Sequence, residues 1–279
     1  MLALGAGWLL LSPSPASAAP PPPPPGPHPT TTPPRTPMPP APPGGRETGT
    51  QFATRIGRLS GSAREQAILD AVSRGSVPNA LLVGYAVETS VPGHTGTFYV
   101  APDYFGIGVD GDWIRMPMYP GTAQRIADSF GSLLPTKKMV DLIHRAAPVK
   151  ISFTAKTSDR GSTATFIESD HDIERKRAGR TGLTAGQKKD IVITNGLIRH
   201  PGNVAIYGAW DAQGNVIQGP GANVTSHSKT YVDYSHGVRL IKPTMIVDGR
   251  EMRVVDVLAD PQLAGLISDE GVITATRYV

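Results

Sequence analysis

Proline crowds the beginning of this chain, where 17 of its 28 prolines stand before Arg46. A proline lacks the backbone N–H that helices and sheets need, and the Thr, Gly and Ala residues between these prolines bury little apolar surface. Such a segment cannot build a helix, a sheet or a core, and it is typical of an extended, disordered linker. We place this Pro-rich linker at residues 20–49, which leaves residues 50–279 for a single domain of ordinary size.

The residues before the linker are typical of an export signal. Leu2–Leu11 is an apolar run of the length of a signal-peptide core, and Ala16, Ser17 and Ala18 fit the small-residue cleavage pattern. The run is too short to span a bilayer. We therefore expect residues 1–19 to be a signal peptide and the protein to be secreted or associated with the cell envelope.

Cysteine content and charge narrow the functions open to the folded part. The chain has no cysteine, which excludes a thiol nucleophile and a disulfide framework. Its net charge of +4 is spread without a long basic block, so it favours an anionic envelope polymer over nucleic acid as a partner. No later apolar run is long enough for us to expect a membrane span.

Hydrophobic periodicity predicts an α+β fold, with helices mainly in the first half and an antiparallel β-sheet mainly in the second half. Helices are expected at residues 62–73, 122–130, 136–147 and 166–178. Strands are expected at residues 81–87, 96–100, 104–109, 112–118, 191–194, 203–210, 216–218, 230–240, 244–247 and 251–255.

Short sequence patterns predict where some of these helices begin and where the chain turns. Ser62 with Glu65 predicts a capping box, and Thr136 predicts a helix cap. Asp110-Gly111 predicts a type I′ hairpin turn and Asp248-Gly249 another tight turn. Asp260-Pro261 predicts the start of a last short helix.

Most of the chemically capable side chains stand in one stretch, residues 227–240. If its second part is an extended strand, Asp233 and Ser235 lie on one face beside open space at Gly237, while His236 points to the other face. The candidate catalytic residues are His227, Asp233, Ser235 and His236, with Lys189 and Asp190 brought to a strand end. The candidate substrate-binding residues are Arg239, Tyr231, Tyr234 and Trp210.

Three interpretations of these residues stay open. A serine mechanism would use Ser235 as the nucleophile and His227 as its base, with Asp233 to orient the base. A metal mechanism would hold zinc on His227, Asp233 and His236, with His171 as a weaker candidate ligand, and would activate a bound water molecule. In the third interpretation the same residues satisfy one another without chemistry: Asp233 pairs with Arg239 or a lysine, and His236 bonds to backbone carbonyls.

Two motifs resemble known families. Ser235-His236-Gly237-Val238-Arg239-Leu240 is similar to the Ser-His-Gly-Cys-Ile/Val-Arg-Leu signature of the L,D-transpeptidases, without its cysteine, and implies a related backbone turn and a cell-wall setting. Lys189-Asp190-Ile191-Val192 and Asn203-Val204-Ala205-Ile206-Tyr207-Gly208 resemble two strands of the NlpC/P60 peptidases, with Asn203 at the position of the catalytic histidine. The folded region also looks like a group of exported bacterial proteins of unassigned function.

These patterns lead us to expect a secreted hydrolase that acts on cell-envelope or extracellular polymer, peptide or glycan, through a His/Asp/Ser site that zinc could assist. The alternative is a non-catalytic envelope-binding or structural module. In that case Tyr231, Tyr234 and Trp210 would be core residues or a platform for a sugar ring.

Overall fold

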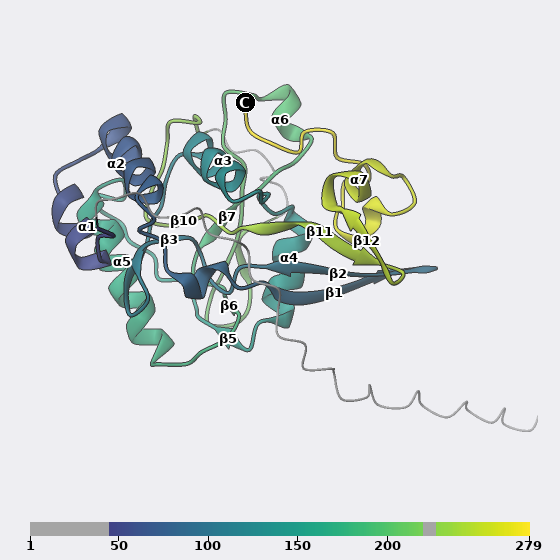
Figure 1. Ribbon diagram of the computed structural model, residues 1–279, viewed down its shortest axis with the longest axis horizontal. Coiled ribbons are helices and arrows are strands. Elements are labelled where there is room, and N and C mark those ends of the chain that lie inside the picture. Colours follow the sequence, from purple (N-terminus) through teal and green to yellow (C-terminus); the bar gives the residue numbers. More distant parts are fainter. Residues whose placement is uncertain (1–44, 220–226) are drawn as a thin grey trace, which may run out of the picture. The chain divides into compact units, whose positions relative to one another are not determined.

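Four β-sheets and the helices packed on them make up the part of the chain that the computed structural model describes, residues 45–219 and 227–279 (Figure 1). The expected α+β class is confirmed, and the longer helices all lie before residue 178. All described residues belong to one compact unit. The predicted signal peptide and the linker up to residue 44 lie outside the described residues.

The first sheet is antiparallel and has the strand order β1-β2-β11-β12. Its strands are β1 (Tyr85–Val91), β2 (His94–Val100), β11 (Ile241–Val247) and β12 (Arg250–Arg253). Phe98 and Met245 pair across β2 and β11 and are both fully buried. Asp248 and Gly249 both have positive φ between β11 and β12, so the predicted tight turn is confirmed.

The second sheet carries the stretch of chemical interest and has the order β10-β7-β8-β9. Its strands are β10 (His236–Gly237), β7 (Lys189–Ile191), β8 (Ile206–Trp210) and β9 (Val216–Gln218). The edge strand β10 runs parallel to β7, while β7, β8 and β9 are antiparallel. His236 lies opposite Lys189 in this register, and Gly237 lies opposite Asp190.

The predicted strand over residues 230–240 is wrong except for its two residues in β10. The Asp233 carboxylate accepts the backbone N–H of Ser235 at 2.8 Å, and the Asp233 carbonyl accepts the N–H of His236 at 3.1 Å. An aspartate that bonds its own backbone two residues on favours a turn over a sheet ladder. The chain therefore bends just before it enters the sheet.

Two short sheets complete the strands. β3 (Gly106–Val109) and β4 (Asp112–Arg115) form the predicted hairpin, but only Gly111 has positive φ in its turn, so the turn is not type I′. β5 (Val149–Lys150) pairs in parallel with β6 (Thr184–Ala185). The strand predicted at 81–87 is shifted: Asn79–Leu82 is a 3₁₀ helix, and β1 begins at Tyr85.

The helices are α1 (Gly49–Ile56), α2 (Gly61–Ser73), α3 (Pro120–Ser129), α4 (Lys137–Ala146), α5 (Thr163–Arg177), α6 (Gly196–Arg199) and α7 (Val254–Ala259). Helix α4 contacts β1 of the first sheet and β8 of the second, so it connects the two sheets. Thr136 caps α4 as predicted, because its side chain accepts the N–H of Met139. The predicted Ser62 cap is wrong: Ser60 occupies the cap position of α2, and Glu65 accepts the N–H of Tyr119 at the start of α3.

Helix α7 replaces the end of the strand predicted at 251–255. Val254, Val257 and Leu258 are buried with the spacing of one helix face, which a short window of apolar residues does not distinguish from a strand. The helix predicted at Asp260-Pro261 is a turn followed by a 3₁₀ helix at Ala264–Leu266.

The packed structure begins before residue 50. Arg46 donates from its Nε to the carbonyl of Gly75 at 2.6 Å, and the N–H of Glu47 donates to the hydroxyl of Ser76 at 2.9 Å. Arg46 and Glu47, assigned to the linker from the sequence, are thus bonded to the turn after α2, and Thr48 caps α1. Within the two described ranges, no helix combines the length and the apolar character that crossing a membrane would need.

Candidate functional site

Three aromatic rings follow one another at the start of the stretch 227–240. The His227 ring stacks on Tyr231 with 4.2 Å between the ring centroids, and Tyr231 and His236 make an edge-type contact with centroids 5.8 Å apart. His227 is exposed, Tyr231 is half-buried, and His236 is 1% exposed. The two candidate catalytic histidines therefore lie on either side of Tyr231, one at the surface and one in the interior.

Asp233 is surrounded by hydrogen-bond donors. Its Oδ1 accepts the N–H and the hydroxyl of Ser235, at 2.8 and 2.5 Å, and its Oδ2 accepts the Tyr231 hydroxyl at 3.0 Å and Arg160 at 2.7 Å. Burial by itself raises the pKa of Asp233, but the nearby His236 and these hydrogen bonds outweigh it and lower the pKa to about 2. Asp233 is therefore ionised at neutral pH, and its cationic partner is Arg160, not Arg239.

Ser235 is buried, and its hydroxyl proton points to a carboxylate. A serine hydroxyl has one proton to donate, and here it goes to Oδ1 of Asp233. A nucleophilic serine needs a general base at that proton, most often an imidazole, and no imidazole bonds it here. The closeness of Ser235 to Asp233 was expected from the sequence, but it comes from a turn, and it gives Ser235 the role of positioning the carboxylate.

His236 is a buried imidazole with two unused nitrogens. Neither Nδ1 nor Nε2 has a hydrogen-bond partner in the described part of the chain. Burial lowers the pKa of His236, the charge of Asp233 opposes this, and Lys189 and His227 add to the lowering, so the pKa is about 4. At neutral pH the ring is therefore neutral, with one nitrogen that can donate a hydrogen bond and one that can accept. Buried polar atoms normally have partners, so this ring stands out.

Lys189 is the neighbour of His236 in the sheet. It is half-buried, and among the described residues its ammonium has neither a hydrogen bond nor an ion pair. Burial lowers its pKa, partly offset by Asp233, and Arg160 adds to the lowering. The preceding residue, Lys188, is fully buried and donates to the Tyr234 carbonyl at 2.6 Å, and burial lowers its pKa to about 8.

Asp190 lies on the other face of the sheet from Lys189, because successive strand residues alternate between faces. Asp190 accepts the Tyr104 hydroxyl at 2.7 Å, and its Oδ1 lies 3.5 Å from Nε of Arg239. Burial raises the pKa of Asp190 to about 6, against the opposing effects of Arg239 and Tyr104. The space expected at Gly237 is filled by Tyr104, since a Cβ there would lie 2.4 Å from Cδ1 of that ring.

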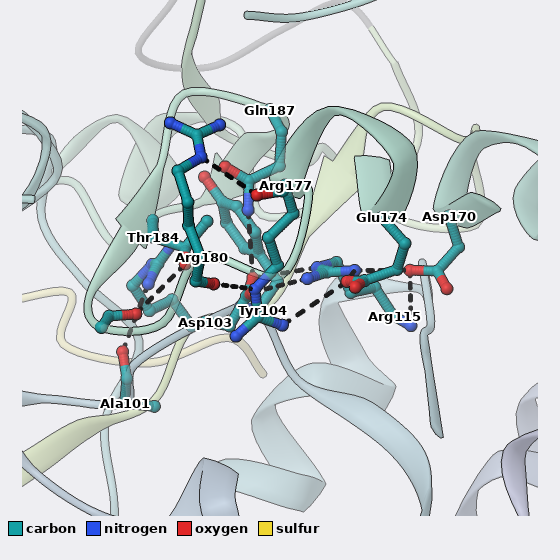
Figure 2. A network of polar contacts seen from close by, with 12 residues as sticks. Ala101, Asp103, Tyr104, Arg115, Asp170, Glu174, Arg177, Arg180, Thr184 and Gln187 are labelled. Atoms are coloured by element: carbon teal, nitrogen blue, oxygen red, sulfur yellow. Dashed lines mark hydrogen bonds and ion pairs between the residues drawn. The ribbon is translucent and has the colours of Figure 1, made fainter. Parts of the chain in front are cut away.

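A network of charges around the buried Arg115 lies behind this face (Figure 2). Figure 2 shows Arg115 between Asp103 and the carboxylates of α5. Arg115 binds Asp103 through Nε at 3.0 Å and through Nη2 at 2.6 Å, and it binds Asp170 at 2.9 Å and Glu174 at 2.7 Å. Gln187, just before β7, donates to Asp103 at 3.0 Å. The network therefore ties β4 and α5 to the segment that leads into the site strand.

The remaining candidates lie apart from an open site. Tyr234 is buried and accepts the N–H of Lys156 at 2.6 Å, and Trp210 is buried against His144, with 3.8 Å between the ring centroids. Neither offers an exposed platform for a sugar. His171 is exposed on α5. In residues 45–219 and 227–279, no three His, Asp or Glu side chains are grouped so that they could hold a metal ion, and this applies to the set of His227, Asp233, His236 and His171.

Sequence reasoning missed Arg160, Lys188 and Arg115. Arg160 stands in a polar loop whose spacing to Asp233, 73 residues on, carries no periodic signal. Lys188 precedes a predicted strand, and a lysine at that position carries no signal that it is buried. Comparisons with family models, with curated proteins and with solved structures find no match for this chain. The resemblances to L,D-transpeptidases and to NlpC/P60 peptidases stay predictions.

Proposed function

We propose that this protein is an exported hydrolase of cell-envelope or extracellular polymer, in which His236 accepts the proton of the attacking water molecule. The observation that carries the proposal is the buried His236 ring whose two nitrogens have no partner among the described residues. A neutral imidazole can take up a proton as water attacks and return it to the leaving group. Export is supported by the signal-like residues 1–19 and the Pro-rich linker.

Asp233 supports this role through its charge. It is held as a carboxylate near His236, so it stabilises the imidazolium that forms when the ring takes the proton. Tyr231, Ser235 and Arg160 position that carboxylate through their hydrogen bonds. In the reaction, water oxygen bonds to a carbonyl carbon, its proton moves to the imidazole, and the C–N bond breaks as the proton passes to the leaving nitrogen.

A peptide bond fits this site better than a glycosidic bond. Most glycoside hydrolases use two carboxylic side chains on either side of the bond. Here the Asp190 carboxyl faces Tyr104 and Arg239, and the Asp233 carboxylate is occupied by Arg160 and its other donors. A histidine is the residue most often used for general acid–base catalysis in acyl transfer.

The second candidate is a non-catalytic module, favoured by one observation. Asp233 is fully satisfied by its neighbours, as in a structural turn. This candidate accounts for Asp233 and Ser235, but it does not explain why the buried His236 nitrogens have no hydrogen-bond partner among the described residues.

The test compares the full chain with His236→Gln and with His144→Gln as a matched control, on dye-labelled peptidoglycan, a protein and a soluble glycan. His144 suits the control because burial also lowers its pKa to about 4, yet it stacks on Trp210. We expect the wild type to release peptide fragments, His236→Gln to be slower by roughly 10²–10⁴-fold, and His144→Gln to be unchanged. No release from any polymer by wild type, or full activity of His236→Gln, overturns the proposal.

A further inference from the structure

Two unpartnered side chains stand beside each other on one face of the second sheet. His236 of β10 and Lys189 of β7 are directly opposite in a parallel register, which places their side chains on the same face. The His236 nitrogens have no hydrogen-bond partner in the described part of the chain, and the Lys189 ammonium senses the charges of Asp233 and Arg160 there without a hydrogen bond or ion pair to either. The proposed hydrolysis uses one nitrogen of His236 and leaves its other nitrogen and Lys189 unassigned.

The charges around this pair are mostly positive. The charged and titratable groups that face His236 are Asp233, Lys189, His227 and Lys188, and those that face Lys189 are Asp233 and Arg160. Three cations, Lys188, Lys189 and Arg160, thus stand against the carboxylate of Asp233. That carboxylate is bound to Arg160 at 2.7 Å, so it does not neutralise Lys189 by direct contact.

We propose that Lys189 anchors an oxyanion of the ligand, a carboxylate or a phosphate, beside His236. The neutral imidazole donates one N–H to the same group and keeps its second nitrogen for water, because one oxyanion offers at least two acceptor oxygens. A neutral sugar hydroxyl would leave the half-buried ammonium without a counter-charge, and a cationic group would be repelled. This assignment names the substrate class of the hydrolase site and so rests on the proposed function for its biological meaning.

Lys189 and two residues near the Lys189–His236 pair are accessible to solvent. Lys189 is only half-buried, the Arg160 side chain is 43% exposed, and His227 is exposed. An anionic group on a polymer can therefore reach the Lys189 ammonium and the Arg160 guanidinium from solvent. Peptides with free carboxylates and phosphodiester-linked polymers are two sources of such a group.

The test measures binding without catalysis. Chelator-treated full-length protein is titrated calorimetrically with inorganic phosphate, with N-acetylalanine, and with N-acetylalanine amide as the neutral control. The variants are Lys189→Met and, as a matched control, Lys229→Met, which removes an exposed charge from the neighbouring segment. We expect one or both anions to bind, the amide not to bind, and Lys189→Met to weaken binding by about tenfold or more, with Lys229→Met unchanged.

A second measurement does not depend on the folding of a variant. The imidazole ¹⁵N resonances of His236 in the wild type should move when the bound anion is added. Stronger binding of phosphate or of N-acetylalanine identifies the source of the oxyanion. Absence of binding by both anions, or equal binding by Lys189→Met, overturns the inference.

The two proposals fail separately. Anion binding that depends on Lys189, together with no polymer cleavage by the wild type, ends the hydrolase proposal and leaves the anion site standing. Cleavage that depends on His236, together with no anion binding, ends the anion site alone.

Discussion

Replacing Arg115 with methionine should destabilise the domain strongly. The guanidinium is 1% exposed and makes two hydrogen bonds to Asp103 and one to Asp170, both of which are buried. Methionine has a similar length but no charge, so Arg115→Met leaves two buried carboxylates without their partner. Removing one member of a buried ion pair costs about 3–5 kcal/mol, a large share of the 5–15 kcal/mol that stabilises a typical domain. Urea unfolding followed by tryptophan fluorescence measures this loss.

The free energy of unfolding that Arg115→Met loses should depend on pH. Burial raises the pKa of Asp103 and of Asp170, and Arg115 opposes it; the net pKa is lowered for Asp103 and raised for Asp170. Without Arg115 both values rise. The folded variant then takes up protons more readily than its unfolded chain, so its stability increases as pH falls, whereas wild type keeps the contribution of Asp103 throughout this range and loses it only below about pH 3.8. The difference between variant and wild type should therefore shrink from about pH 8 to about pH 5.

Arg277→Met serves as the control. Arg277 forms an ion pair with Asp128 at 2.9 Å, but these side chains are 58% and 43% exposed. An exposed pair contributes about 0–1 kcal/mol, so this variant should be close to wild type at both pH values. The reasoning is refuted if Arg115→Met costs no more than Arg277→Met, or if its cost is the same at both pH values.

Three further predictions concern single contacts: a close packing contact, a hydrogen bond and a helix cap. Gly237→Ala puts a Cβ 2.4 Å from the Tyr104 ring and should cost about 1–3 kcal/mol in urea unfolding, whereas Gly121→Ala, with open space around its Cβ, should cost nothing. Tyr104→Phe removes a donor to Asp190 and should raise the pKa of that carboxyl above about 6 in a carboxyl ¹³C NMR titration. Thr136→Ala removes the cap of α4 and should cost about 1 kcal/mol in urea unfolding. The first prediction is contradicted if the two glycine variants are equally stable, and the second if the Asp190 titration does not change in Tyr104→Phe. The third is contradicted if the urea midpoint of Thr136→Ala equals that of wild type.

Local chemistry explains which expectations succeeded. The Thr136 cap and the Asp248-Gly249 turn depend on a few neighbouring residues, so the sequence predicts them correctly. The strand expected at 230–240 failed for a local reason too: Asp233 competes with the sheet by bonding the backbone of Ser235. The strand propensity of residues 230–240 did not show that the turn at Asp233 would prevail over the sheet.

The sequence by itself determined the α+β class, most of the elements, and the concentration of histidine, aspartate and serine at residues 227–236. Only the tertiary structure decided the partners of those side chains. Arg160 reaches Asp233 across 73 residues, Arg115 reaches Asp170 across 55, and Lys189 comes to His236 through a parallel strand pair. Turns and periodic faces arise from bonds between near neighbours, whereas ion pairs and unpartnered groups arise from packing between distant segments, which no local pattern records.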